Sequence, residues 1–327
     1  MQIFSKIHGQ TVTHTDFNND CIHQLGTLDF QDRVAVIGSG PSCPFVTPLE
    51  DLVKRLEKSC HVRKTSSEYH WDFCERAYAK NATKYFEEIQ RSFGNTPEWD
   101  ARAYKHLVAI NFRSYVTFNY DDQLPNAFRT KLGPEFSDSF RVYPARNTEK
   151  FFLPSDLVGH KPRLAAIHGY KNDADSLWHK KLILRVSDYN EHYGDGTRPD
   201  GTSRFPELYG WWHTLLTTQP CVFIGISLRE PGLHNVITDL VKDENPALKE
   251  QSHIHLKHTE RMPESPFYES PGTSLFVIRQ VLYDKVDTNF TGLLDVLSAF
   301  SNIPAGRPVP KMPKRTPIAI NCKYPEF

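Results

Sequence analysis

Apolar residues gather in four short, continuous runs, and longer stretches with helical periodicity separate them. The runs are Val34–Ile37, Tyr115–Phe118, Leu164–Ile167 and Cys221–Ile224. Runs of this length are typical of strands that are buried on both faces of a parallel sheet. Because helical stretches alternate with them, they predict an α/β fold with a Rossmann-like, doubly wound parallel sheet.

A group of helices interrupts this pattern after the first strand. Residues 48 to about 56 predict one helix, and residues 66 to about 89 predict a longer one whose aromatic residues share a face. Tyr104–Asn111 predicts a third helix. We interpret the shared aromatic face as core packing. The region from about residue 60 to about residue 112 is therefore expected to form an inserted helical lobe.

The rest of the pattern completes one domain. The further elements that it predicts are an edge strand at Gln10–His14, strands at His253–Leu256 and Ser274–Ile278, and an amphipathic helix at Phe290–Phe300. Residues 303–327 are rich in Pro and Lys, which is typical of an extended tail. We expect one domain over residues 1–302, followed by a tail that could pack on a neighbouring subunit.

The charge and the apolar content narrow the classes of partner. Of 327 residues, 39 are Lys or Arg and 39 are Asp or Glu, so no overall positive field would recruit nucleic acid. No stretch approaches the roughly 20 apolar residues that span a bilayer. The start, Met1–Lys6, lacks the apolar core of a signal peptide. We expect a cytoplasmic protein that binds neither nucleic acid nor a membrane directly.

The six cysteines are scattered, and no two stand two residues apart. A structural zinc site normally has closely spaced pairs of ligands, and a disulfide framework suits a small secreted chain. We therefore expect no metal, and most of the thiols buried as small hydrophobic groups. His253 and His255 are other candidate ligands, but alternation along a strand explains their spacing more simply.

The first strand runs into a glycine turn. The turn is Gly38-Ser39-Gly40-Pro41-Ser42, and a helical pattern opens soon afterwards at Pro48. Glycines let the backbone reach positive φ and let a ligand approach, while the N–H groups at a helix start point toward the ligand. The order of strand, turn and helix favours a bound phosphate, and ordinary turn chemistry is the alternative.

The other strands also end in candidate chemistry. Asn119 and Asp121 follow the second run, His168 follows the third, and residues 225–228 follow the fourth. Because the carboxyl ends of parallel strands meet at one edge of the sheet, these groups predict a single ligand crevice. Taken singly, such an Asn is usually a cap and such a His is usually a core or surface residue. Their order at successive strand ends favours a functional role.

The ordered set of strand ends resembles the sirtuin-like NAD-binding domain over roughly Arg33 to Phe300. In that pattern a glycine turn precedes the motifs Thr-x-Asn-x-Asp, His-Gly and Phe-x-Gly-x-Ser-Leu, which here occupy residues 38–42, 117–121, 168–169 and 223–228. The chain looks most like the bacterial branch that hydrolyses NAD. That branch favours Asp-Tyr-x-x-x-Tyr, as at Asp188, Tyr189 and Tyr193.

Three features depart from the sirtuin pattern. Ser39 stands where the family has Ala, a small-for-small change that should leave a phosphate cradle intact. Glu230 replaces the Asp of the branch's Ser-Leu-x-Asp-Pro ending. The paired zinc cysteines that support the acetyl-lysine groove of protein deacetylases are missing from the sequence, which argues against deacylation.

The resemblance implies NAD as the substrate and assigns roles to residues. Asn119 would orient a water or a ribose hydroxyl, and His168 would act as a general base. Cleavage of the nicotinamide–ribose bond would pass through a cation like that of glycoside hydrolysis. The residues assigned to binding NAD are Gly38, Ser39, Gly40, Ser42, Asp121, Gly225, Ser227 and Leu228.

The leading hypothesis is an NAD hydrolase that depletes NAD as a bacterial antiphage defence effector. Such an enzyme would be inactive until it forms a homo-oligomer or until a separate regulatory or sensor protein signals to it, by analogy an ATPase or Argonaute-type subunit. A non-catalytic sensor of NAD or ADP-ribose is the alternative. A protein deacylase is the least favoured of the three.

Overall fold

The computed structural model describes most of the chain before residue 302. The described residues are 5–7, 10–12, 19, 21–23, 25–26, 28–42, 49–94, 102–132, 141–142, 151, 163–171, 176–194, 207–228, 230–242, 252–259, 267–268, 277–284 and 291–301. The expected tail over residues 303–327 lies outside them.

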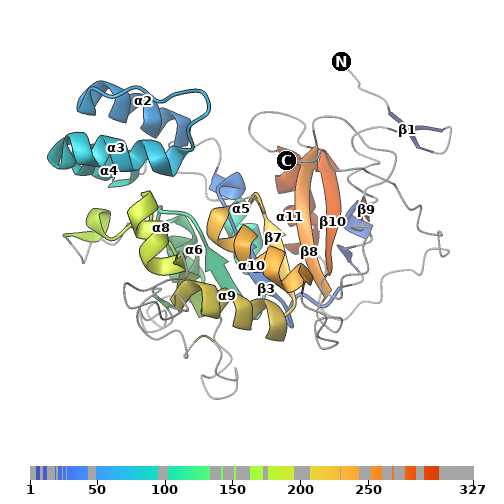
Figure 1. Ribbon diagram of the computed structural model, residues 1–327. Coiled ribbons are helices and arrows are strands. Elements are labelled where there is room, and N and C mark those ends of the chain that lie inside the picture. Colours follow the sequence, from blue (N-terminus) through green and yellow to red (C-terminus); the bar gives the residue numbers. More distant parts are fainter. Residues whose placement is uncertain are drawn as a thin grey trace.

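The described residues form an α/β fold around one sheet of eight strands (Figure 1). In chain order the strands are β3 (Val34–Ile37), β4 (Ser114–Thr117), β5 (Arg141–Val142), β6 (Arg163–Ala166), β7 (Cys221–Ile224), β8 (Ser252–Thr259), β9 (Phe267–Tyr268) and β10 (Val277–Asp284). The spatial order is β5-β6-β4-β3-β7-β8-β10-β9, and only the β10–β9 pair is antiparallel. The segment β6-β4-β3-β7-β8-β10 therefore has the Rossmann order 3-2-1-4-5-6, which confirms the predicted Rossmann-like sheet.

The four strands that carry the predicted site end in one row. Ile37 of β3 pairs with Thr117 of β4 and with Ile224 of β7, and Thr117 pairs with Ala166 of β6. The residues that follow these four strands therefore start from the same edge of the sheet. Since the chain order reverses between β3 and β7, this edge is also where Rossmann-like folds bind their ligands.

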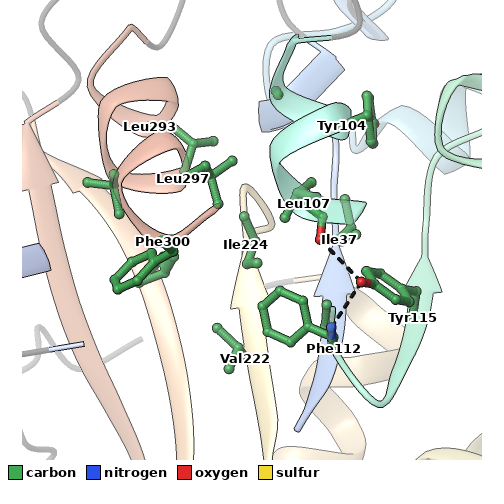
Figure 2. Packing of buried hydrophobic residues seen from close by; sticks show 14 of the residues in the cluster. Ile37, Tyr104, Leu107, Phe112, Tyr115, Val222, Ile224, Leu293, Leu297 and Phe300 are labelled. Atoms are coloured by element: carbon green, nitrogen blue, oxygen red, sulfur yellow. Dashed lines mark hydrogen bonds between the residues drawn. The ribbon is translucent and has the colours of Figure 1, made fainter. Parts of the chain in front are cut away.

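Helices cover both faces of the sheet because alternate strand residues point to opposite sides. On one face, α5 (Arg102–Ile110), α6 (Gln123–Leu132) and α11 (Thr291–Ser301) pack on side chains such as Ile37. Figure 2 shows Leu107 of α5 and Leu297 of α11 in this core. On the other face, α9 (Glu207–Thr218) and α10 (Pro231–Lys242) pack on side chains such as Val36. The sheet is thus doubly wound.

A helical lobe stands beside the carboxyl edge of the sheet (Figure 1). Its helices are α2 (Leu49–Cys60), α3 (His70–Lys80) and α4 (Ala82–Gly94), and they share a separate hydrophobic core. Tyr78 and Tyr85 of the predicted aromatic face pack in that core, as expected, whereas Trp71 stacks on the exposed Tyr69 instead. The single long helix predicted from residue 66 to about residue 89 is wrong, because Asn81 separates α3 from α4. Its side-chain Oδ1 accepts a hydrogen bond from the Lys84 N–H at 3.0 Å and so caps the new helix.

Two predicted strands lie differently from expectation. The strand expected at Ser274–Ile278 instead runs from Val277 to Asp284, and residues 274–276 lie outside the described part. The expected edge strand near the N-terminus is β2 (Gln10–Val12), which pairs with β1 (Ser5–Ile7) in a separate two-stranded sheet. Among the described helices, none is both long and apolar enough to cross a membrane.

Candidate functional site

Two glycine turns pack backbone against backbone at the end of β3 and β7. The Gly38 N–H donates to Ile224 O and the Gly40 N–H donates to Gly225 O, both at 3.0 Å. A Cβ built on Gly40 would lie 2.6 Å from the Gly225 Cα, and Gly225 itself has a φ of +61°. The glycines therefore permit a close approach of the two turns. The two N–H groups considered for phosphate binding are engaged within the protein.

Asn119 lies at the centre of a buried polar cluster. Its side-chain Nδ2 is 2.9 Å from Gly38 O, 3.1 Å from Ser42 Oγ and 2.7 Å from the Tyr104 hydroxyl. Ser42 Oγ is also 2.6 Å from the Tyr104 hydroxyl and donates to Asp121 Oδ2 at 3.2 Å. The amide has only two hydrogens for three acceptors, so the hydroxyls can exchange partners when a ligand arrives. The cluster joins three predicted residues, Ser42, Asn119 and Asp121.

Burial perturbs the carboxyl group of Asp121. Desolvation raises its pKa to about 6, although the hydrogen bonds from the Gln123 N–H and from Ser42 Oγ act to lower it. The Gln123 N–H lies 2.9 Å from Asp121 Oδ1 and belongs to the first turn of α6. At neutral pH the carboxylate is thus available as an acceptor for a hydroxyl group, such as one on a ribose.

His168 is buried among aromatic rings on the neighbouring strand end. The ring centroids of Phe118, Tyr189 and Tyr193 lie 4.9, 5.4 and 5.9 Å from its own. Its Nε2 is 3.0 Å from the Tyr193 hydroxyl, which also accepts a hydrogen bond from Trp212 Nε1 at 3.3 Å. Burial lowers the pKa of His168 to about 3, so the imidazole is neutral at neutral pH.

Glu230 also lies near Nε2 of His168, on the same side of the ring as the Tyr193 hydroxyl. Its Oε2 accepts the Leu233 N–H at 2.9 Å and so caps α10, while its Oε1 is 3.8 Å from His168 Nε2. This Oε1 is buried and has no hydrogen-bond partner among the described residues. Burial raises the pKa of Glu230 to about 7 despite hydrogen bonds from the Leu233 N–H, the Tyr189 hydroxyl and the Gly232 N–H. Glu230, which replaces the Asp of the family motif, thus lies beside His168, the predicted catalytic histidine.

The remaining predicted residues are distributed around these two clusters. Ser39 and Ser227 are exposed at the two glycine turns, and Leu228 is half-buried against the core under α9 and α10. In the Asp-Tyr-x-x-x-Tyr segment, both tyrosines face His168, whereas Asp188 forms an ion pair with Arg185 and caps α8 (Val186–Tyr193). Asp188 is therefore a structural residue.

Sequence reasoning missed Tyr104 and the position of Glu230. Tyr104 begins the periodic pattern of its helix like any core residue, so only the fold reveals that its hydroxyl reaches Asn119. For Glu230 the signal was available, because it is a mismatch within an otherwise matching motif.

Among the described residues, the other histidines and cysteines singled out in the sequence are buried and do not form a metal site. His253 Nε2 lies 3.0 Å from Leu216 O, and His255 Nε2 lies 2.9 Å from Ile226 O. The residues described by the structure contain no group of three or more His, Cys, Asp or Glu that could hold a metal. Cys21, Cys60, Cys74 and Cys221 are buried, as expected, and are not in disulfides among the described residues, while Cys43 and Cys322 lie outside those residues.

A comparison with known protein families finds a match to the part of the chain that carries most of the site residues. A family model described as SIR2-like domain matches residues 113–272, just under half of the chain. The matched span contains Asn119, Asp121, His168 and the turn after β7, but not the first glycine turn. No curated protein matches the chain. The match supports a place among sirtuin-like proteins and, with it, an activity that involves NAD.

Proposed function

We propose that this protein is an NAD glycohydrolase, which cleaves the nicotinamide–ribose bond of NAD to give nicotinamide and ADP-ribose. One observation carries the proposal: Asn119 and His168 follow neighbouring parallel strands that end in the same row, beside the glycine turns at the reversal point of a Rossmann-like sheet. The SIR2-like match over this span supports the choice of NAD.

The residues at this edge fit the parts of NAD. The cluster of Asn119, Ser42, Asp121 and Tyr104 offers neutral donors and one carboxylate, a set suited to ribose hydroxyls. The exposed Ser39 lies on the turn before the 3-10 helix η1 (Gly40–Ser42), where the pyrophosphate of a dinucleotide binds in Rossmann-like folds.

The reaction requires two things of the protein: it must orient the attacking water, and it must provide one group that accepts the proton of that water. Nicotinamide leaves NAD as a neutral molecule because its ring nitrogen takes the electrons of the breaking bond. A water then forms a bond to C1′ of the ribosyl cation and loses a proton. Asn119 orients the water or a hydroxyl beside it, and the neutral imidazole of His168 accepts the proton, a role typically worth ~10²–10⁴-fold in rate.

Control of the activity follows from its effect on a cell. An unregulated hydrolase would deplete the NAD of its own host, so we propose that the protein acts as an antiphage defence effector that waits for a signal. The signal would be homo-oligomer formation or a separate regulatory protein, of the ATPase or Argonaute type by analogy. The resemblance to the bacterial NAD-hydrolysing branch supports this part of the proposal.

The test is incubation of the purified protein with NAD at several protein concentrations, with nicotinamide followed by chromatography. We expect release by the wild type that rises steeply with concentration, and at least ~10²-fold less by His168→Ala or Asn119→Ala. The mass of the second product separates ADP-ribose from a cyclised form, which lacks the added water. No release at any concentration, together with no thermal stabilisation by NAD, would refute the hydrolase.

The non-catalytic sensor differs in one observable. It would gain thermal stability on addition of NAD or ADP-ribose without releasing nicotinamide. A protein deacylase would release nicotinamide only when an acylated peptide is present.

A further inference from the structure

The side chain of Glu230 combines two contacts that one shorter carboxylate could not easily make. Helix N-caps favour Asp, Asn, Ser and Thr, whose short side chains reach the N–H of the third helical residue. Glu230 makes that contact through Oε2, to the Leu233 N–H, and its extra methylene leaves Oε1 beside His168. Capping α10 therefore does not explain the choice of Glu.

The buried Oε1 atom is the second observation. It has no hydrogen-bond partner among the described residues, and it lies 3.8 Å from His168 Nε2. Buried polar atoms are nearly always hydrogen-bonded, because leaving one without a partner is unfavourable. The Tyr189 hydroxyl hydrogen-bonds the Glu230 carboxyl group, and the imidazole of His168 is the second group beside it that can donate a hydrogen, with Nε2 3.8 Å from Oε1.

Tyr193 completes the arrangement around Nε2. Its hydroxyl is 3.0 Å from that nitrogen, and its ring packs against the start of α10, where a Cβ on Gly232 would lie 2.1 Å from the ring. The tyrosine therefore holds the histidine ring and α10 together. Both groups that face Nε2, the Tyr193 hydroxyl and the Glu230 carboxyl, come from elements other than the strand that carries His168.

We propose that Glu230 is a positioning residue for the NAD-hydrolysing reaction: it holds the Nε2 side of His168 and takes up the proton that the imidazole passes on. The inference rests on the proposed function and adds a residue that the sirtuin motif does not supply at this position. His168 remains the group that touches the reacting water.

The proton balance of the step is simple. A water O–H bond breaks as the oxygen bonds to C1′, and Nδ1 of His168 accepts the proton. The proton on Nε2 moves to Oε1 of Glu230, so the imidazole stays neutral and the carboxylate becomes a carboxylic acid. After ADP-ribose leaves, Glu230 returns its proton to Nε2 and Nδ1 releases its proton to solvent, which restores the starting tautomer and the carboxylate.

The relative acidities of the two groups match this direction of transfer. Burial raises the pKa of Glu230 to about 7 and lowers that of His168 to about 3, so a proton shared by the pair resides on Glu230. The titratable groups that face the pair are Tyr120 after β4, and Tyr189, His192 and Tyr193 of α8. Below pH 7 Glu230 already carries the proton, so turnover should fall.

Two substitutions separate the proton role from the helix cap. Glu230→Gln keeps an oxygen for the Leu233 N–H but cannot take up a proton. Glu230→Asp keeps a carboxylate and a favourable cap, but withdraws the carboxylate by about 1.5 Å, the length of one C–C bond. Asp239→Asn is the matched control, because it lies nine residues further along α10, about 13 Å away along the axis.

The experiment measures nicotinamide release by the full-length chain from pH 5 to 9, together with KM for NAD and the melting temperature. We expect Glu230→Gln to lower kcat at least ~10-fold, with KM within twofold of the wild type and no acidic limb near pH 7. Glu230→Asp should recover part of kcat, and Asp239→Asn should match the wild type. Wild-type kcat and pH profile in Glu230→Gln would overturn the inference. So would a loss that Glu230→Asp does not partly restore, or one that accompanies a lower melting temperature.

A measurement without turnover keeps the two proposals apart. The ¹⁵N shift of His168 Nε2, assigned by its disappearance in His168→Ala, should show a step near pH 7 in the wild type and none in Glu230→Gln. If the wild type releases nicotinamide but this step is missing, the inference about Glu230 fails and the hydrolase stands. If the wild type releases none and NAD does not raise its melting temperature, the hydrolase fails, and the step then reports only whether the two side chains are coupled.

Discussion

Replacing Gly225 by Ala should push apart the two glycine turns that follow β3 and β7. An added Cβ would lie 2.5 Å from Pro41 Cδ and 2.8 Å from Gly40 Cα, and the residue would keep a φ of +61°. The left-handed backbone disfavours Ala, and relief of the contacts must stretch the hydrogen bond from the Gly40 N–H to Gly225 O. Together these effects should lower the free energy of unfolding by about 2 to 4 kcal/mol.

The matched control for this change is Gly210→Ala. Gly210 lies within α9, and nothing comes within 4 Å of a Cβ built there. The same chemical change should therefore raise the free energy of unfolding by about 0.5 to 1 kcal/mol, because Ala favours a helix. Urea unfolding followed by circular dichroism measures both. If Gly225→Ala unfolds within 0.5 kcal/mol of the wild type, as judged against the ordinary error of the method, the close packing of the two turns is refuted.

Three further predictions concern single side chains. Asn119→Ala should abolish nicotinamide release while the melting temperature of the chain shifts by only a few degrees, and a global loss of fold instead would assign the residue a structural role alone. Because burial raises the folded pKa of Asp121 to about 6, ionisation makes the native state less stable as pH rises from about 4 through 6. Asp121→Asn should therefore gain up to about 3 kcal/mol relative to the wild type between pH 4 and pH 7.5 in urea unfolding, and an unchanged difference would contradict the shift. Asn81→Ala should lower the unfolding free energy by about 1 kcal/mol through loss of the α4 cap, whereas exposed Lys84→Ala should change it by less than half as much.

The sheet and the edge that carries the site follow from the apolar pattern. Strands buried on both faces are short and continuously apolar, and this is the signal seen at Val34–Ile37 and Cys221–Ile224. Polar residues at the ends of such runs are therefore brought to one edge, as Asn119 and His168 are.

The features that the sequence does not predict depend on single side chains or on distant partners. The break between α3 and α4 requires one side chain, Asn81, to act as a cap within an unbroken aromatic periodicity. The strand β10 mixes polar and apolar residues and so lacks a clear apolar run. The prediction therefore placed the strand too early, at the apolar residues that begin before Val277. The contact between Glu230 and His168 joins residues 62 positions apart, and no local pattern encodes it.

The helical lobe and the two proposed catalytic strand ends are linked through a few contacts. Phe93 of α4 packs on Tyr120, the neighbour of Asn119, with ring centroids 5.1 Å apart. The Tyr120 hydroxyl donates to Ile183 O at 2.8 Å, and the Ile183 N–H donates to His168 O at 3.0 Å. The residues on either side of Ile183, Leu182 and Leu184, are buried in the core of the lobe. The lobe is therefore joined by direct contacts to the two strand ends that carry Asn119 and His168, and its placement and theirs are set together.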